Sequence, residues 1–490
     1  MIRRHHPTLA AVALAVFSLL GSSAALAAPG VDEPPVPGTP RPLQLPAMHD
    51  SALPNGVRVI VVPRADLPLV SVALHLRLGA AADPDGQAGL ASLTNTLRTK
   101  GATRGGKALD ATQLARQAEA LGGTLEAVTN WGGSTISTTV ASSKLAEALA
   151  LVADTLMQPT LQAQELARLR EQTADGLKFS MSDPMALAGL AARRAWWGSA
   201  VYGGSLTPAS LARITLADVQ AFHRQQLRPE LATLVISGDV TPEAGLAMAT
   251  RQLGGWRGNR MALPQARQEP ASPATPATVL INLPGAGQSG VVVMAPGVPA
   301  ASPQRRVAQV AGAVLGGGYS ARLNTEVRIK RGLSYGASAS QEYQPVGGVL
   351  SAATQTNHPT AAQVALLMQG EILKLGTEAP SADELGARQA TLVGNFGRQV
   401  ETTAGLAASV LDQVVRQRPL TELRQFAPEV MAVTPEQVRS YAASQWPASA
   451  LRTVIVGDTA AAGDSLKALD PKALQIDAAK LDLDAGKLSR

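Results

Sequence analysis

The sequence has no cysteine and few aromatic residues, which make up 3% of its 490 positions. Without thiols the chain forms neither disulfides nor thiolate metal sites, so its stability must come from a large core of Leu, Val and Ala. The net charge of +6 is modest, and no basic stripe is interleaved with aromatics, so nucleic acid is not an expected partner. No apolar run reaches the ~18 residues of a transmembrane helix, so we expect no membrane span.

The N-terminus has the pattern of a secretory signal peptide. Two arginines precede a short apolar run, and Ala25-Leu26-Ala27 supplies the small residues that signal peptidase needs. The pattern predicts that residues 1–27 are removed, that the mature chain begins near Ala28, and that the protein is exported to the periplasm. These flanks fit export better than the alternative, a buried N-terminal helix.

Two proline-rich stretches divide the rest of the chain. Residues 28–46 are expected to form an extended tether, and residues 261–277 an interdomain linker. They delimit two segments of comparable size, 47–260 and 278–458. A tail, 459–490, is expected to be a loosely packed helix or disordered.

The two segments end in similar sequences. Ile214–Val240 aligns without a gap on Val433–Thr459, so that Gly238-Asp239 falls on Gly457-Asp458. Each copy reads as a threonine N-cap, an amphipathic helix, a turn with proline and a strand that ends in Gly-Asp. We interpret this as a tandem duplication of one α+β domain.

The order of elements expected in the first segment indicates the fold class. Asn55-Gly56 is typical of a hairpin turn before a strand. Strands are expected at 57–62, 70–78, 123–128 and 134–140, and helices at 87–100, 111–121 and 143–157. Strand pairs and groups of helices in this order predict a largely antiparallel sheet covered by helices.

The segment Leu53–Thr103 resembles the opening of zinc metallopeptidases of the pitrilysin/insulinase family. In that family a helix carries His-x-x-Glu-His, which brings two imidazoles to one zinc ion and a general base to the bound water. In this sequence the frame reads GLASLTNT, so Ser92 and Thr96 replace the histidines and Asn95 replaces the glutamate. Hydroxyls and an amide bind zinc poorly, and an amide takes no proton from water.

The remaining candidate ligands offer no substitute. The family's third ligand, a glutamate on a later helix, would fall near Gly176, with Glu171 and Asp175 beside it. The mature chain has four histidines, none in a metal-ligand spacing: His49, His75, His223 and His358. We therefore expect no catalytic residue, no metal and no cofactor in this chain, and zinc only on a partner subunit.

The second segment keeps a signature of the same family. Residues 316–340 are similar to the motif of that family's C-terminal domain and read GGGYSARLNTEVRIKRGLSYGASAS. The resemblance implies that Arg328 and Tyr335 hold the substrate's backbone near the scissile carbonyl, where donors stabilise developing negative charge. It also implies that a glycine run lets substrate approach closely: Gly316, Gly317 and Gly318. The alternatives are that Arg328 is a solvated charge at the end of a helix, that Tyr335 packs in the sheet, and that the three glycines form a simple hinge.

The resemblance covers about 47–458 and implies half of a clam-shell, in which two such chains pair and one of them can lack zinc. The first hypothesis is that the chain is a non-catalytic, substrate-binding subunit of a heterodimeric metallopeptidase. Its partner would be a homologous zinc-containing chain, and the substrate would be an unstructured peptide. The second is a peptide-binding or structural clam-shell protein with no peptidase role. The retained Arg328 and Tyr335 favour the first, since a scaffold has no use for them. A third hypothesis is a hydrolase with a new active site, but the sequence offers no residues that could be named for such a site.

Overall fold

The computed structural model describes residues 44–259, 269–273 and 276–489. The expected signal peptide, 1–27, lies outside the described residues, as do most of the tether and much of the linker. None of the helices in the described ranges has the length and apolarity needed to cross a membrane.

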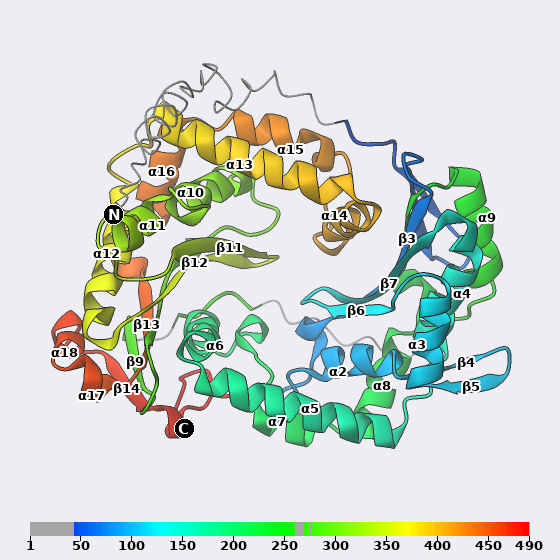
Figure 1. Ribbon diagram of the computed structural model, residues 1–490, viewed down its shortest axis with the longest axis horizontal. Helices are drawn as coiled ribbons and strands as arrows, with labels where there is room; N and C mark the ends of the chain where they lie inside the picture. Colours follow the sequence, from blue (N-terminus) through cyan, green and yellow to red (C-terminus); the bar gives the residue numbers. More distant parts are fainter. Residues whose placement is uncertain (1–43, 260–268, 274–275, 490) are drawn as a thin grey trace, which may run out of the picture. The chain divides into compact units, whose positions relative to one another are not determined.

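The first half builds a six-stranded sheet in the order β1-β2-β8-β3-β7-β6. Strands β3, β7 and β6 of this sheet are labelled in Figure 1. Only the pair β2 and β8 is parallel. The strands, with a separate β4–β5 hairpin, are β1 (His49–Ala52), β2 (Arg58–Pro63), β3 (Leu69–Arg77), β4 (Gly101–Arg104), β5 (Lys107–Asp110), β6 (Glu126–Thr129), β7 (Gly133–Ala141) and β8 (Ala232–Gly238). The helices are α2 (Leu90–Arg98), α3 (Ala111–Ala120), α4 (Leu145–Met157), α5 (Ala163–Ser182), α6 (Pro184–Trp197), α7 (Pro208–Arg213), α8 (Leu216–Gln226) and α9 (Pro242–Leu253).

The second half builds another six-stranded sheet in the order β11-β12-β10-β13-β9-β14. Its strands are β9 (Thr278–Asn282), β10 (Ser289–Gly297), β11 (Ala337–Gln344), β12 (Gly347–Thr356), β13 (Arg452–Gly457) and β14 (Leu474–Asp477). Its helices are α10 (Arg305–Gly316), α11 (Arg322–Asn324), α12 (Ala361–Lys374), α13 (Ala382–Glu401), α14 (Thr403–Val415), α15 (Glu422–Met431), α16 (Pro435–Gln445), α17 (Thr459–Ala462) and α18 (Ser465–Leu469).

The two sheets share one topology, which confirms the predicted α+β fold of two homologous domains. Five strands of the first, β2-β8-β3-β7-β6, match β9-β13-β10-β12-β11 of the second. The aligned segments form the same unit in each: α8 then β8, and α16 then β13. In both, the strand lies between a parallel and an antiparallel neighbour. Thr215 and Thr434 cap the two helices through equivalent capping boxes, as the sequence predicted.

Each sheet is also covered by a helix from the other half. Helix α6 packs on β10 and β13, and α14 packs on β3 and β8 (Figure 1). Ser71 on β3 hydrogen-bonds Thr403 at the start of α14, with 2.8 Å between the hydroxyl oxygens. The core of each half therefore includes residues from both expected segments.

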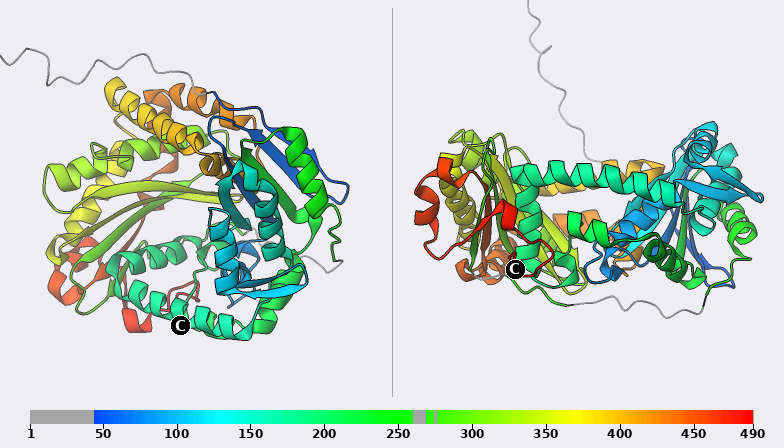
Figure 2. Two further views of the ribbon diagram at one scale, coloured as in Figure 1. Left: turned by 45° about the vertical axis from the view of Figure 1, so that its right-hand side comes forward. Right: turned by 90° about the horizontal axis from the view of Figure 1, so that it is seen from below.

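The tail is better ordered than expected. It contributes β14, which pairs in parallel with β9, because Leu474 and Ile476 alternate with polar residues as a strand requires. The chain then lies beside α6 (Figures 1 and 2), where the carbonyl of Leu483 accepts a hydrogen bond from the Nε of Arg194 at 2.7 Å. Leu483 and Leu488 are buried in the core there, which explains the order of this segment.

Candidate functional site

Helix α2, which carries the degenerate motif, begins at a carboxylate supplied by its own loop. The side chain of Asp83 accepts hydrogen bonds from the backbone N–H of Gly89 at 2.7 Å and of Ala91 at 2.8 Å. Burial raises the pKa of Asp83 to about 7, although these backbone donors act to lower it. The positive end of the helix is therefore already satisfied by the protein.

The three motif positions do not form a metal site. Ser92 is exposed, Thr96 is half-buried, and Asn95 is only 1% exposed. The Nδ2 of Asn95 donates to the carbonyl oxygen of Val128 at 3.0 Å and to that of Thr135 at 3.1 Å. The amide therefore ties α2 to the β6–β7 hairpin. Hydroxyls and a committed amide are not the donor set of a zinc ion, so the residues present do not fit that metal.

A buried cation stands one turn further along α2. Arg98 is fully buried and donates to the Oδ1 of Asn95 at 3.4 Å, to the Nδ1 of His223 at 3.1 Å and to Gln226. Burial lowers the pKa of Arg98 to about 9. Burial, aided by the charge of Arg98, lowers the pKa of His223 to about 2. His223 thus accepts a hydrogen bond as a neutral ring. The guanidinium group adds a positive charge that would oppose a bound cation.

The other candidate ligands lie apart. Glu171, Asp175 and Gly176 are exposed on α5, where Asp175 pairs with Lys178 at 3.0 Å. In the described ranges, no three His, Cys, Asp or Glu side chains gather as a metal would require. The remaining histidines are packed or at the surface: His75 bonded to Thr135, His358 bonded to Ser289, and exposed His49.

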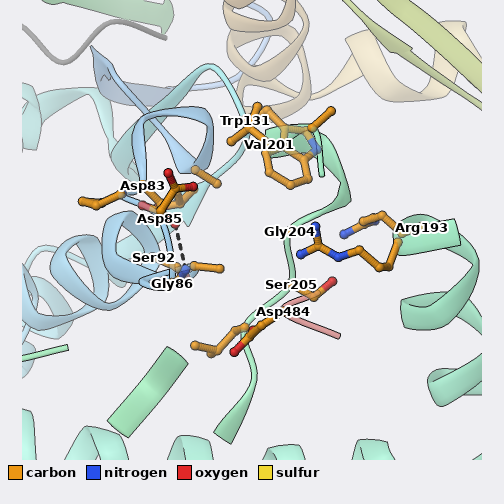
Figure 3. Close-up of a pocket in the computed structure, with 18 of the residues that line it drawn as sticks. Asp83, Asp85, Gly86, Ser92, Trp131, Arg193, Val201, Gly204, Ser205 and Asp484 are labelled. Atoms are coloured by element: carbon orange, nitrogen blue, oxygen red, sulfur yellow. Dashed lines mark hydrogen bonds between the residues drawn. The ribbon is translucent and has the colours of Figure 1, made fainter. Parts of the chain in front are cut away.

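A cavity of about 500 Å³ lies beside the motif. Ser92 and the loop before α2 form one side, and Arg193 and Ser205 lie on the other (Figure 3). The end of β6 and the following Trp131 line it as well, and Asp484 of the tail completes the wall. Sequence reasoning missed this cavity, because its walls come from segments far apart in the chain.

Arg328 and Tyr335 lie outside that cavity, at the edge of the second sheet. Arg328 is in a π-helical turn, Thr325–Ile329, and its guanidinium carbon is 5.1 Å from the centre of the Tyr319 ring. Tyr335 is 93% exposed and precedes the edge strand β11. The alternative of a tyrosine packed in the sheet is therefore wrong. A single π-turn inside a helix is frequent at functional sites.

Asn324 fixes both ends of the segment that carries these two residues. It is 4% exposed, its Nδ2 donates to the carbonyl of Tyr319, and its Oδ1 accepts from the backbone N–H of Ala337 at 3.2 Å. Thr354 on β12 donates to the carbonyl of Gly336 at 2.7 Å. Neither Tyr319 nor Asn324 was singled out from the sequence, although both stand inside the signature.

The glycine run has mainly a packing role. A Cβ on Gly316 would lie 2.0 Å from the backbone nitrogen of Ala339 on β11, and one on Gly317 would lie 2.7 Å from the backbone of Ala313. The close approach of α10 to β11 therefore accounts for Gly316, and the tight turn that ends α10 accounts for Gly317. Gly318 is exposed and meets only the guanidinium of Arg388.

Comparison with known proteins agrees with this geometry. Residues 58–190 match the family model described as Insulinase (Peptidase family M16), and residues 213–392 match the one described as Peptidase M16 inactive domain. The chain belongs to the insulinase family, M16. It is 26% identical over 306 residues to an uncharacterised zinc protease of Mycobacterium leprae, covering 61% of this chain and 67% of that one. A Mycobacterium tuberculosis homologue of the same description is 25% identical over 310 residues, covering 62% and 69%.

Solved structures share the M16 fold across nearly all of the described chain. A peptidase M16 inactive domain from Pseudomonas fluorescens superposes with a TM-score of 0.75 at 23% identity, covering 84% of this chain and 98% of that one. A protease from Helicobacter pylori gives 0.78 at 18% identity, covering 84% and 100%. The match to the M16 inactive domain and the replaced zinc-motif residues describe a non-catalytic, peptidase-like member of the family.

Proposed function

We propose that this chain is the non-catalytic, substrate-binding subunit of a heterodimeric, exported zinc metallopeptidase. The partner would be a homologous M16 chain with an intact zinc motif, and the complex would work in the periplasm on unstructured peptides. This chain would bind no zinc itself. One observation carries the proposal: Arg328 and Tyr335 are displayed on an ordered segment at a sheet edge, whereas the zinc-motif positions are occupied by groups that cannot do the chemistry.

The chemistry asked of these residues is hydrogen-bond donation. A guanidinium and a phenol next to an edge strand can hold the backbone of an extended peptide and donate to the carbonyl oxygen that gains negative charge during hydrolysis. Tyr319 supports this role because its ring faces the guanidinium of Arg328, which limits the orientations of that side chain.

The experiment uses the complex with the zinc-containing partner. Arg328→Ala and Tyr335→Phe should each lower turnover by ~10²–10³ without changing the mass of the complex or its melting temperature. Tyr319→Ala should lower turnover several-fold, and Tyr319→Phe should restore it, because the ring rather than the hydroxyl faces Arg328.

Arg331→Ala is the matched control. Arg331 is an exposed arginine three residues from Arg328, and it pairs with Glu326. Unchanged turnover in both Arg328→Ala and Tyr335→Phe would refute the proposal and leave the alternative, a peptide-binding or structural protein with no peptidase role.

A further inference from the structure

The cavity beside the degenerate motif contains one cation that no acidic group neutralises. In the parts of the chain that the structure describes, Arg193 makes no ion pair, and its only recorded partner is the ring of Trp131, whose centre lies 5.7 Å from the guanidinium carbon. Arg193 is exposed on α6 and lies across the cavity from Asp83 and Ser92 (Figure 3). Its five N–H donors are in the fork arrangement that suits a carboxylate.

The other charged groups that line the cavity, Asp85 included, already have partners. Arg194 donates to the carbonyls of Leu483 and Gly198, at 2.7 and 2.9 Å. Asp484 accepts a hydrogen bond from the hydroxyl of Thr207 at 3.0 Å and forms an ion pair with Arg213, which does not line the cavity. Asp83 caps helix α2. Arg193 therefore remains the group through which the cavity can attract an anion.

Ser205 adds a second unsatisfied group to the same wall. It is 8% exposed, and its hydroxyl finds no hydrogen-bond partner within the described ranges. The Oγ atom is closed to solvent in this conformation, so the Ser205 side chain must rotate toward the cavity to donate to a ligand and recover the free energy that an unpaired buried hydroxyl costs. Figure 3 shows Ser205 and Arg193 on the same side of the cavity.

The position of the cavity indicates what kind of anion it suits. Strand β6 is an edge of the first sheet, and its last residue, Thr129, lines the cavity together with Asn130 and Trp131. A peptide paired parallel to β6 would run into this cavity with its C-terminal end. Trp131 is held in place by a hydrogen bond from its Nε1 to Glu342, at 3.2 Å.

We propose that this cavity binds the C-terminal carboxylate of a short peptide, with Arg193 as the principal ligand and Ser205 as a secondary donor. A volume of about 500 Å³ accommodates the last few residues of such a peptide. The inference rests on the peptide-binding part of the proposed function but not on Arg328, Tyr335 or a partner subunit.

The test is calorimetric titration of the purified chain alone with tetra-alanine, as the free acid and as the C-terminal amide. The free acid should bind at least ~10-fold more tightly than the amide, because the amide removes a charge-assisted hydrogen bond. Arg193→Ala should weaken binding of the free acid by a similar factor, and Ser205→Ala by a smaller one. Arg116→Ala, at an exposed arginine on α3 away from the cavity, should leave the dissociation constant within twofold.

Three results would overturn the inference: equal affinity for acid and amide, unchanged affinity in Arg193→Ala, or no heat of binding at millimolar peptide. The last experiment is a competition of acetate against the tetrapeptide acid. If acetate competed as strongly as the tetrapeptide acid, the cavity would be a general anion site and the assignment to a peptide end would be wrong. None of these results bears on the activity assay of the complex, so failure of this inference can be distinguished from failure of the proposed function.

Discussion

Replacing Asn95 by aspartate tests whether the position of the family's general base has become a structural one. The change keeps the shape of the side chain, which is 1% exposed, but removes its Nδ2 donors, so the backbone carbonyls of Val128 and Thr135 each lose a partner. Each lost donor costs about 1–3 kcal/mol, and the new carboxylate faces the carbonyl oxygens. Arg98, at 3.4 Å from the present Oδ1, offsets part of this cost.

We expect Asn95→Asp to lower the free energy of unfolding by about 2–4 kcal/mol, which corresponds to a fall in melting temperature of about 6–12 °C for a domain of this size. Differential scanning calorimetry at pH 7.5 measures it. Ser92→Asp, an exposed change on the same helix, is the control and should shift the melting temperature by less than about 2 °C. Equal shifts in the two variants would refute the structural role of Asn95.

Two further predictions concern stability. The pKa of His75 is lowered to about 4 by burial, so the unfolded chain binds a proton that the folded chain refuses. The contribution of His75 to the free energy of unfolding should fall by about 2–3 kcal/mol between pH 7.5 and 4.5, and His75→Gln should remove this part of the pH dependence in urea unfolding. Gly316→Ala should abolish soluble expression, because its Cβ would overlap the backbone of Ala339, whereas Gly318→Ala should fold, because Arg388 can move aside; equal yields of the two variants would contradict this.

Local patterns predicted the elements but not their partners. The expected strand at 57–62 is β2, one residue displaced, and the expected helix at 143–157 is α4, two residues shorter at its start. The exchange of α6 and α14 was not predictable, because an amphipathic helix shows which face is buried but not which sheet covers it. The structural role of Asn95 was not predictable either, because its hydrogen-bond partners follow it by more than 30 residues in the sequence.

Arg98 shows how a sequence can mislead. An arginine near the end of a short helix is normally a solvated charge that favours the C-terminal dipole. Here the helix packs against α8, and Arg98 is enclosed with His223 and Gln226. Only the tertiary contact between α2 and α8 distinguishes a buried cation from an ordinary surface one.

The two halves share a fold but differ in the exposure of the residues in their family motifs. In the first, the motif position of the general base is closed: Asn95 is bonded to the backbone, and a buried guanidinium stands behind it. Restoring histidines at 92 and 96 would still leave that positive charge in place and the acidic residues of α5 exposed. In the second half, Tyr319 and Tyr335 are 66% and 93% exposed on a segment held by Asn324. Neither ring is buried in the packing of its own domain, which leaves both rings accessible for the contact with a substrate peptide that we propose.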